Sequence, residues 1–474
     1  MQNRKDLLQA HRLMTQRAGL ALLQGEPDTA EQPLRRMNMA TFAGVMIAAL
    51  AVAIFWILGI LTHSGAQGLP SAGSVVIDEN GNSYVRCTQG GATRLCPVIN
   101  NASARLAASV AAGSDAIDVR KVSLSSLATF PRGPVIGISG LPPLPAPASL
   151  VHGPWSVCVR TVGSLATGQQ QVSTLVAGRP VGGQQVRNAG AILVQAQNQE
   201  WLVWNDQRLA TAHAVAALLP GGAQGPVQVP LQWLNALPAG PALVPLVPPD
   251  FGSPATNSPA GPETVGHVYT VASGGVMLWY VQLRDGLAQI TETEFDLLQT
   301  ELQAQQTSLS LSNVVSHLSP TKEFSPADLP SALPRIVSYD PTTPLCVVHS
   351  RAGEGGHSGA ITTGGAIPPG AQPVPAASSG TAQPNPPVDQ VWLPPGAGAL
   401  VSVIQGPGQP TAYVLVTGAG KYPLASPAVA GVLGYTMGVP CAGQCTAVPA
   451  NIVNLIPAGP ALDPKRAVQP VTGG

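Results

Sequence analysis

Residues 229–243 read VPLQWLNALPAGPAL, and residues 448–462 read VPANIVNLIPAGPAL. A string this particular that returns far along the same chain indicates internal duplication. Weaker copies run from Val122 to Pro134 and from Phe324 to Pro334. The sequence therefore predicts four repeated units of about forty to fifty residues each.

Each copy ends a unit that begins in a similar way. An aromatic residue opens a predicted strand, a polar turn that usually contains glycine follows, and a second strand leads into a short helix. These features predict a β-rich α+β fold made of strand–strand–helix repeats. The aromatic residues are Tyr84, Trp201, Tyr280 and Tyr413. The expected helix caps are Asn100, Thr211, Thr293 and Ser426, the last followed by Pro427 at the first helical position.

The segments between the repeats have a different character. Residues 155–159 (WSVCV) and 345–348 (LCVV) have the apolar, β-branched composition of strands. Residues 353–387 consist largely of Gly, Pro, Ser and Ala, which predicts an exposed or disordered loop, and residues 248–262 form a shorter linker of the same kind. We therefore expect four peripheral repeats around a central β domain that is assembled from distant segments.

An uncharged apolar run extends from Met39 to Leu61. At about 1.5 Å of rise per residue, a helix of this length crosses a hydrocarbon core of roughly 30 Å. Six Lys and Arg residues precede the run, the last two being Arg35 and Arg36, and the next basic residue is Arg86. By the positive-inside rule, this asymmetry predicts a single-pass protein of the cell membrane with a cytoplasmic N-terminus and an extracytoplasmic C-terminal bulk.

A cleaved signal peptide is the alternative reading of this run. The run is too long for a signal peptide, the region before it is too extended, and residues 62–64 (THS) make a poor cleavage site, so the sequence favours a retained anchor. In the tail, Asn3 to Gln24 has its apolar residues on one stripe of a predicted amphipathic helix. The sequence leaves open whether this helix lies on the inner leaflet or docks a cytoplasmic partner.

These observations divide the chain into eight segments. They are 1–38, the cytoplasmic amphipathic tail; 39–61, the transmembrane helix; 73–137, repeat 1; 138–190, the first part of the central β domain; 191–247, repeat 2; 264–334, repeat 3; 335–405, the second part of the central β domain with the Gly/Pro-rich loop 353–387; and 406–464, repeat 4.

The net charge is zero and only 10% of the residues are charged, which disfavours a nucleic-acid-binding face. All six cysteines follow the apolar run, as expected for a compartment in which disulfides persist. A metal site is the alternative, but the chain has no CxxC motif and no neighbouring pair of histidines. We expect three disulfides: Cys87–Cys96 across a hairpin turn, Cys441–Cys445 across a short loop and, from the cysteines that remain, Cys158–Cys346.

Two short motifs resemble catalytic signatures without meeting their requirements. Residues 418–421 (GAGK) lack the upstream glycine of a P-loop, and Tyr422 replaces its Ser or Thr, so we expect a hairpin turn there. Residues 356–360 (GHSGA) resemble a nucleophile elbow, but they lie in the Gly/Pro-rich loop instead of a strand–turn–helix.

The densest acidic group is interpreted as a solvated helix face with charges in the first turn. Its members are Asp285, Glu292, Glu294 and Asp296. We therefore expect no catalytic, cofactor-binding or metal-binding residues and no cofactor.

Taken together, these features resemble one known family. The chain resembles EccB, the single-pass membrane component of the type VII secretion machinery of actinobacteria, nearly throughout and in the same order. The resemblance implies four repeat domains around a central β domain stapled by one disulfide, here Cys158–Cys346; the other two pairs are not part of the family pattern. It rests on residues 33–36 (PLRR) before one anchor, residues 100–106 (NNASARL), residues 280–286 (YVQLRDG), Trp155 with Cys158, and Leu345 with Cys346.

The resemblance also implies partners: the motor ATPase EccC, EccD and EccE in the membrane, and the mycosin protease outside. Family members often carry an ATPase label, but this sequence shows neither a phosphate cradle nor a set of metal ligands. We therefore expect a structural subunit that links the inner-membrane core to an extracytoplasmic scaffold for protein export, packing against partners or copies of itself. An extracytoplasmic ATPase and a cell-wall-binding repeat protein are the alternatives.

Overall fold

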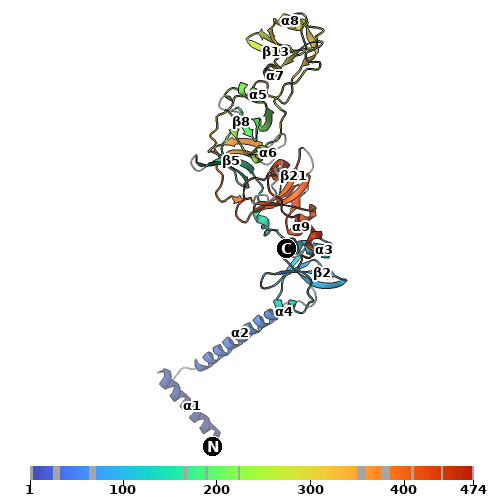
Figure 1. Ribbon diagram of the computed structural model, residues 1–474. Helices are drawn as coiled ribbons and strands as arrows, with labels where there is room; N and C mark the ends of the chain where they lie inside the picture. Colours follow the sequence, from blue (N-terminus) through green and yellow to red (C-terminus); the bar gives the residue numbers. More distant parts are fainter. Residues whose placement is uncertain are drawn as a thin grey trace. The chain divides into compact units, whose positions relative to one another are not determined.

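Figure 1 shows the computed structural model of the chain. The chain forms two compact units, Met1–Gly68 with Val122–Ala128, and Leu69–Lys121 with Thr129–Gly474. The β-sheets described below all belong to the second unit. The structure describes residues 4–24, 33–62, 71–164, 168–186, 190–222, 225–349, 359–374, 385–406, 410–438 and 441–471.

The first unit is helical in the part that the structure describes. Helix α1 (Arg4–Gln24) covers the predicted amphipathic tail, and α2 (Pro33–Thr62) covers the predicted anchor. A one-turn helix, α4 (Leu124–Leu127), belongs to the same unit.

The four repeats share one order of elements: three strands, a helix, a fourth strand and a second helix. The first three strands form an antiparallel meander, and the fourth pairs parallel with the first. Repeat 1 contains β1 (Ser74–Ile77), β2 (Ser83–Gln89), β3 (Ala92–Val98), α3 (Asn101–Ala112), β4 (Asp118–Lys121) and α4. Repeat 2 contains β8 (Ile192–Ala196), β9 (Gln199–Trp204), β10 (Gln207–Thr211), α5 (His213–Leu218), β11 (Val227–Gln228) and α6 (Leu231–Asn235).

Repeats 3 and 4 follow the same order with small additions. Repeat 3 contains β12 (Val268–Ser273), β13 (Val276–Leu283), β14 (Gly286–Ile290), α7 (Glu292–Leu302), β15 (Gln306–Ser308), α8 (Leu311–Ser316) and β16 (Leu318–Glu323). Repeat 4 contains β21 (Gly398–Ile404), β22 (Ala412–Thr417), β23 (Gly420–Pro423), α9 (Ala428–Leu433), the β24–β25 ribbon (Met437–Gly438 and Ala442–Gly443), β26 (Cys445–Pro449) and α10 (Ala450–Val453), followed by α11 (Pro464–Ala467).

In repeats 1, 2 and 4 the duplicated string ends the repeat by returning along its third strand. In each of these repeats the returning chain forms two parallel β-bridges with the third strand. The two bridged positions are three residues apart on the third strand and four residues apart on the returning chain. This shared register explains why PAGPAL recurs. The bridged pairs are Leu95 with Arg132 and Val98 with Ile136, Arg208 with Ala239 and Thr211 with Leu243, and Lys421 with Ala458 and Leu424 with Leu462.

The glycine of the recurring Pro-x-Gly-Pro pattern lies where the returning chain approaches that strand most closely. Gly133, Gly240 and Gly459 each donate their amide to the strand, to the carbonyls of Leu95, Arg208 and Lys421 respectively. A Cβ there would meet sulfur of the Cys87–Cys96 pair at Gly133, the Gln207 side chain at Gly240, and the Tyr422 ring at Gly459. A neighbouring group therefore leaves no room for a Cβ at each of these glycines, and that group differs between repeats.

The central sheet has seven strands in the order β19-β20-β6-β5-β17-β18-β7. Its middle pair, β5 and β17, is antiparallel and joins Trp155 to His349 and Val159 to Leu345. The strands are β5 (Trp155–Ser164), β6 (Gly168–Ala177), β7 (Gln184–Gln185), β17 (Leu345–His349), β18 (Gly359–Thr363), β19 (Gln372–Pro373) and β20 (Gln390–Trp392), and a short 3-10 helix, Pro147–Ser149, precedes them.

One face of this sheet forms a hydrophobic core with repeats 2 and 4. Val157, Leu175 and Val347 of the sheet pack with Trp233 of α6 and Ile452 of α10. A hydrogen bond also connects the two helices: Asn451 Nδ2 of α10 donates to the carbonyl of Ala236, at the end of α6, at 2.6 Å. The two strong copies of the duplicated string therefore meet each other and the central sheet.

The repeats are also joined in pairs through their first helices. Repeats 1 and 4 share a second core in which α3 contacts α9. Repeats 2 and 3 share a third, in which α5 contacts α7. The distal part of repeat 3 has two small clusters of its own.

The structure corrects the predicted repeat, because each unit has a strand before the two that were expected. In repeats 1, 2 and 4 these first strands are apolar and buried along nearly their whole length, for example at Val75, Val76, Leu193 and Val401. A strand buried on both faces lacks the polar alternation that marks a half-exposed strand, so the pattern gives no sign of it. Strand β21 accordingly lies in the sheet of repeat 4, although the predicted boundary at 405 and 406 assigns it to the central domain.

Two predicted loops are more ordered than their composition suggests. Within 353–387, residues 359–363 form β18, which pairs with both β17 and β7. The linker 248–262 packs on repeat 3, where Ala255 donates its amide to Glu263 and Thr256 donates to Arg284. Backbone hydrogen bonds order both segments, so an abundance of glycine and proline does not by itself mean disorder.

The predicted helix caps are correct at one position. Asn100 caps α3, with Oδ1 accepting the Ser103 amide at 2.8 Å. The other caps fall one or two residues away from the prediction, at Ala212 for α5, Thr291 for α7 and Pro427 for α9. Apart from the boundary at 405 and 406, the domain boundaries given above stay a prediction.

We expect Gly459→Ala to destabilise repeat 4 and Gly240→Ala to have a smaller effect on repeat 2. The Tyr422 ring lies between Gly420 and Gly459 and has little room to move, whereas Gln207 can swing aside. Overpacking against a fixed group costs about 1–3 kcal/mol. Thermal unfolding followed by circular dichroism should give a lower midpoint for Gly459→Ala, and equal midpoints would contradict the steric account.

Candidate functional site

The clearest functional element of the first unit is the apolar part of α2. The helix carries, at Met39–Ile57, a stretch that is long and apolar enough to cross a membrane, and none of it is buried within the chain. At about 1.5 Å per residue its 19 residues match a hydrocarbon core of roughly 30 Å. A surface this apolar needs a lipid or protein environment that the chain itself does not supply.

The six cysteines come together in three pairs at disulfide distance. Cys158 and Cys346 lie directly opposite each other on β5 and β17, with Cα atoms 4.0 Å apart, and both are fully buried. Their side chains face away from the core shared with repeats 2 and 4, toward Val176 and Trp392. The Cα–Cα distances of the other pairs are 5.9 Å for Cys87–Cys96 and 5.3 Å for Cys441–Cys445.

The GAGK segment forms the turn between β22 and β23, as predicted. Thr417 pairs with Gly420 at the end of this hairpin. The Lys421 ammonium donates to the Val453 carbonyl at 2.8 Å and to Asn454 Oδ1 at 3.3 Å, and burial lowers the pKa of the amine. Lys421 therefore connects the hairpin to the end of α10, and its charge is engaged within repeat 4.

The segment that resembles a nucleophile elbow, residues 356–360, lies mostly outside the described residues. Gly359 and Ala360 begin β18, whereas 356–358 are not described. No role can be assigned to Ser358 from the structure.

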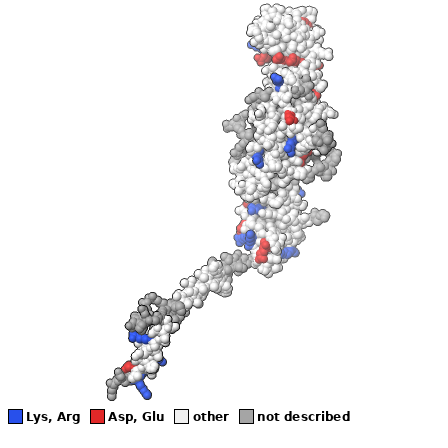
Figure 2. All heavy atoms as spheres, turned by 90° about the vertical axis from the view of Figure 1, so that its left-hand side faces the viewer, with Lys and Arg blue, Asp and Glu red and all other residues white. Residues whose placement is uncertain are grey.

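The acidic group is only partly the solvated face that the sequence suggests. Asp285 accepts a hydrogen bond from Ser319 at 2.7 Å. Glu294 contradicts the prediction because it is fully buried, and desolvation raises the pKa of its carboxyl to about 7. Figure 2 shows acidic side chains in a row on the surface of repeat 3, while most of that face carries no charge.

A second buried titratable residue, His349, was not singled out by its sequence context. It ends β17 opposite Trp155, and its ring contacts Gly359. Burial lowers the pKa of its imidazole to about 4, so the ring is neutral at physiological pH. No motif surrounds it, so the sequence gives no signal of its burial.

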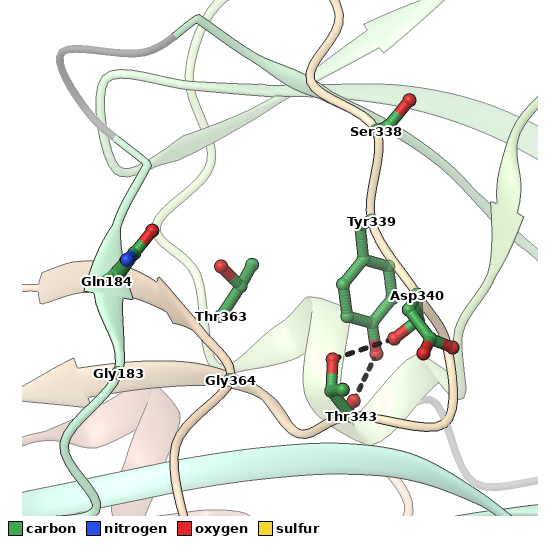
Figure 3. Close-up of a pocket in the computed structure, with 8 residues that line it drawn as sticks. All are labelled: Gly183, Gln184, Ser338, Tyr339, Asp340, Thr343, Thr363 and Gly364. Carbon is green, nitrogen blue, oxygen red and sulfur yellow. Dashed lines mark hydrogen bonds between the residues drawn. The ribbon is translucent and has the colours of Figure 1, made fainter.

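The central sheet also borders a polar pocket of about 270 Å³ (Figure 3). Tyr339 donates its hydroxyl to the Thr343 carbonyl at 2.8 Å, and Thr343 donates its own to the Asp340 carbonyl. The Asp340 carboxylate accepts from the Thr342 amide and hydroxyl, which lowers its pKa. These groups hold a turn together, and within the described chain no cluster of metal-ligating side chains accompanies them.

The comparison with protein families extends over nearly the whole chain. The family described as "Type VII secretion system ESX-1, transport TM domain B" matches residues 2–471. The chain belongs to this EccB family. The family resemblance stated from the sequence is therefore confirmed.

Curated relatives in the EccB family match the chain in part. They include the ESX-2 secretion system ATPase EccB2 of Mycobacterium tuberculosis, 29% identical over 277 residues, or 56% of this chain and 53% of the relative. The ESX-5 secretion system ATPase EccB5 of the same species is 29% identical over 305 residues, or 61% of this chain and 57% of the relative. The chain thus spans about half the length of these relatives.

Solved EccB structures share the fold. A chain in the structure of an intact ESX-5 inner membrane complex has a TM-score of 0.62 at 23% identity, covering 100% of this chain and 96% of that one. A chain of the EccB3 dimer from the ESX-3 core complex has a TM-score of 0.61 at 24% identity, covering 83% and 99% respectively. The β-rich α+β architecture is confirmed by both.

We predict that the three cysteine pairs are disulfides in the folded protein and that they contribute unequally to its stability. In the chain-entropy model, a bridge across a separation of 188 residues raises the free energy of unfolding by about 5 kcal/mol, and one across 4 residues by about 2 kcal/mol. Replacing both Cys158 and Cys346 by Ala should therefore lower the unfolding midpoint more than replacing both Cys441 and Cys445.

Peptide mapping without reductant, on protein purified from membranes, identifies the pairs directly. A free thiol at Cys158 or Cys346 in that preparation would refute the central bridge.

Proposed function

We propose that this chain is a structural subunit of a type VII secretion membrane complex, linking the inner-membrane core to an extracytoplasmic scaffold. The continuity of its cores carries the proposal. Repeats 1 and 4 share one hydrophobic core, and repeats 2 and 4 share another with the central sheet. Close-packed interiors have low compressibility and transmit strain. A body connected in this way is suited to holding partners in fixed positions.

The proposal places the tail in the cytoplasm and the repeats outside. Six basic residues precede the apolar helix, and Arg86 is the first basic residue after it. All six cysteines follow the helix, and disulfides persist in an oxidising exterior. The two arguments are independent and agree, and the disulfide mapping described above also tests this orientation.

The partners are inferred by analogy with the family. The similar solved structures are described as an intact ESX-5 inner membrane complex, the periplasmic assembly from that complex, and an EccB3 dimer. We infer that this chain assembles in the membrane with EccC, EccD and EccE, contacts the mycosin protease outside, and pairs with a copy of itself.

ATP hydrolysis is the competing function, because the curated relatives are named ATPases. Lys421 is the residue that a phosphate-binding loop would use, and its ammonium is already bonded within repeat 4. The neighbouring Tyr422 packs between glycines and offers no hydroxyl of the kind that holds magnesium in a P-loop. We therefore favour the structural role.

The structural role predicts that the tagged full chain, solubilised from native membranes in mild detergent, copurifies with EccC and EccD. Mass spectrometry of the eluate measures the partners. A chain that elutes alone, under conditions in which EccC and EccD remain associated with each other, would contradict the proposal. A variant without residues 4–24 keeps the span, and loss of EccC from this variant alone would assign α1 to docking.

We expect Lys421→Ala to lower stability and leave ATP turnover at the background of the preparation. Loss of a hydrogen-bonded charge costs about 2 kcal/mol, which should appear as a lower unfolding midpoint. Lys322→Ala is the matched control, since Lys322 is exposed on β16 and should leave the midpoint unchanged. Turnover by highly purified wild-type protein that disappears in Lys421→Ala would revive the enzymatic alternative.

A further inference from the structure

Repeat 3 is joined to repeat 2 by a helix contact and by two crossings of the chain. Helices α5 and α7 touch, as Figure 1 shows, and Leu297 of α7 is fully buried in the core of repeat 2. The outgoing crossing, residues 324–337, is bonded to repeat 2, because the Val337 amide donates to the Ala191 carbonyl and the Ile336 amide donates to the Pro220 carbonyl. The incoming crossing is residues 244–249, named here the entry linker.

The entry linker has few backbone donors, since Pro245, Pro248 and Pro249 lack an amide hydrogen. The chain is bonded to repeat 2 at Leu243, whose amide donates to Ala210, and to repeat 3 from Gly252, whose amide donates to Val265. Among the described residues between these two points, Leu246 is the residue whose amide donates a hydrogen bond, and Glu294 Oε1 accepts it.

Glu294 lies at the centre of this joint. It is in the first turn of α7 and shares a helix face with Leu297, three residues later. It has 0% exposed surface, and no protein donor within the described chain reaches its second oxygen, Oε2. An ionised carboxylate here would be held by one backbone hydrogen bond and otherwise deprived of solvent, which is costly.

We propose that Glu294 is a protonation-sensitive latch: in its neutral form it holds repeat 3 and the entry linker against repeat 2, and its ionisation loosens the joint. The neutral carboxyl accepts the Leu246 amide without placing a charge in the interface. The ionised carboxylate has a lower free energy in water than in the interface, where one of its oxygens has no donor within the described chain. Repeat 3 is thereby free to move about the two crossings when the carboxyl loses its proton.

The surrounding charges leave burial as the dominant influence. Burial raises the pKa of Glu294 and the Leu246 hydrogen bond lowers it, and no charged neighbour contributes to the shift. The entry linker carries no titratable group, and His213 of α5 is exposed and bonded to Glu200. The remaining titratable groups on the packed elements are Glu292, Asp296 and Glu301 of α7, Tyr269 and Tyr280 of β12 and β13, and Asp328 and Arg335 of the outgoing crossing.

The direction of the pH dependence follows from where the proton binds more tightly. The docked joint raises the pKa of Glu294 from 4.5 to about 7, so the docked state holds a proton that the open state releases. Docking is therefore fully favoured below about pH 4.5, and it weakens as the pH rises toward 7. Above that window both states are ionised and the dependence levels off.

Hydrogen–deuterium exchange of the full chain in detergent tests the latch on the peptide that contains the entry linker. Dividing the intrinsic exchange rate at each pH by the measured rate gives a protection factor. We expect protection of the wild-type linker to fall on the order of tenfold or more between about pH 5.5 and about pH 8. Glu294→Gln, which stays neutral, should give a flat profile across the same range.

Glu292→Gln is the matched control, because Glu292 lies in the same turn and is partly exposed; its linker should behave as in the wild type. Glu294→Met, also neutral and of similar length, must reproduce the flat profile if Glu294→Gln folds poorly. A wild-type profile that is flat with pH overturns the latch whatever the variants do. A fall in Glu294→Gln or Glu294→Met as steep as in the wild type overturns it equally.

Discussion

The pairing of β5 with β17 is the interaction on which the rest of the second, β-rich unit depends. It joins Cys158 to Cys346 across a sequence separation of 188 residues, with repeats 2 and 3 inserted between the two strands. One face of the pair buries Val157 and Val347 in the core shared with repeats 2 and 4, and the other buries the two cysteines. Loop closure over such a length has a high entropic cost, which a covalent bridge removes from the unfolded state.

The central sheet also constrains the second helices of repeats 2 and 4, which carry the two strong copies of the duplicated string. In repeats 2 and 4 the second helix is packed against the sheet and against its counterpart, so Trp233 and Ile452 are both fully buried. In repeat 3 the corresponding helix α8 leaves Leu311 and Val315 exposed, at 43% and 62%. The second helix is therefore constrained by packing in repeats 2 and 4, whereas the exposed positions of α8 in repeat 3 are free to diverge.

The buried titratable groups of the β-rich unit are concentrated at a few contacts between elements. Most of its surface is uncharged, and its exceptional titratable groups lie at contacts between elements: Glu294 at the junction of repeats 2 and 3, Lys421 between β23 and α10, and His349 at the end of β17. In each case burial shifts the pKa toward the neutral form. These three buried groups thus mark junctions between elements.

Local patterns were sufficient to predict the apolar span, the four repeats, the hairpin at GAGK and the two short-range cysteine pairs, because each depends on the composition or spacing of a single segment. The long-range pair Cys158–Cys346 was predicted from the two cysteines that remained and from the family resemblance. Tertiary contacts were needed to show that apolar strands such as β1 and β21 complete each repeat, that 359–363 is a strand of the central sheet, and that Glu294 is buried. Burial on both faces of a strand, and burial of one carboxyl in an acidic segment, are set by distant parts of the chain, so no local pattern records them.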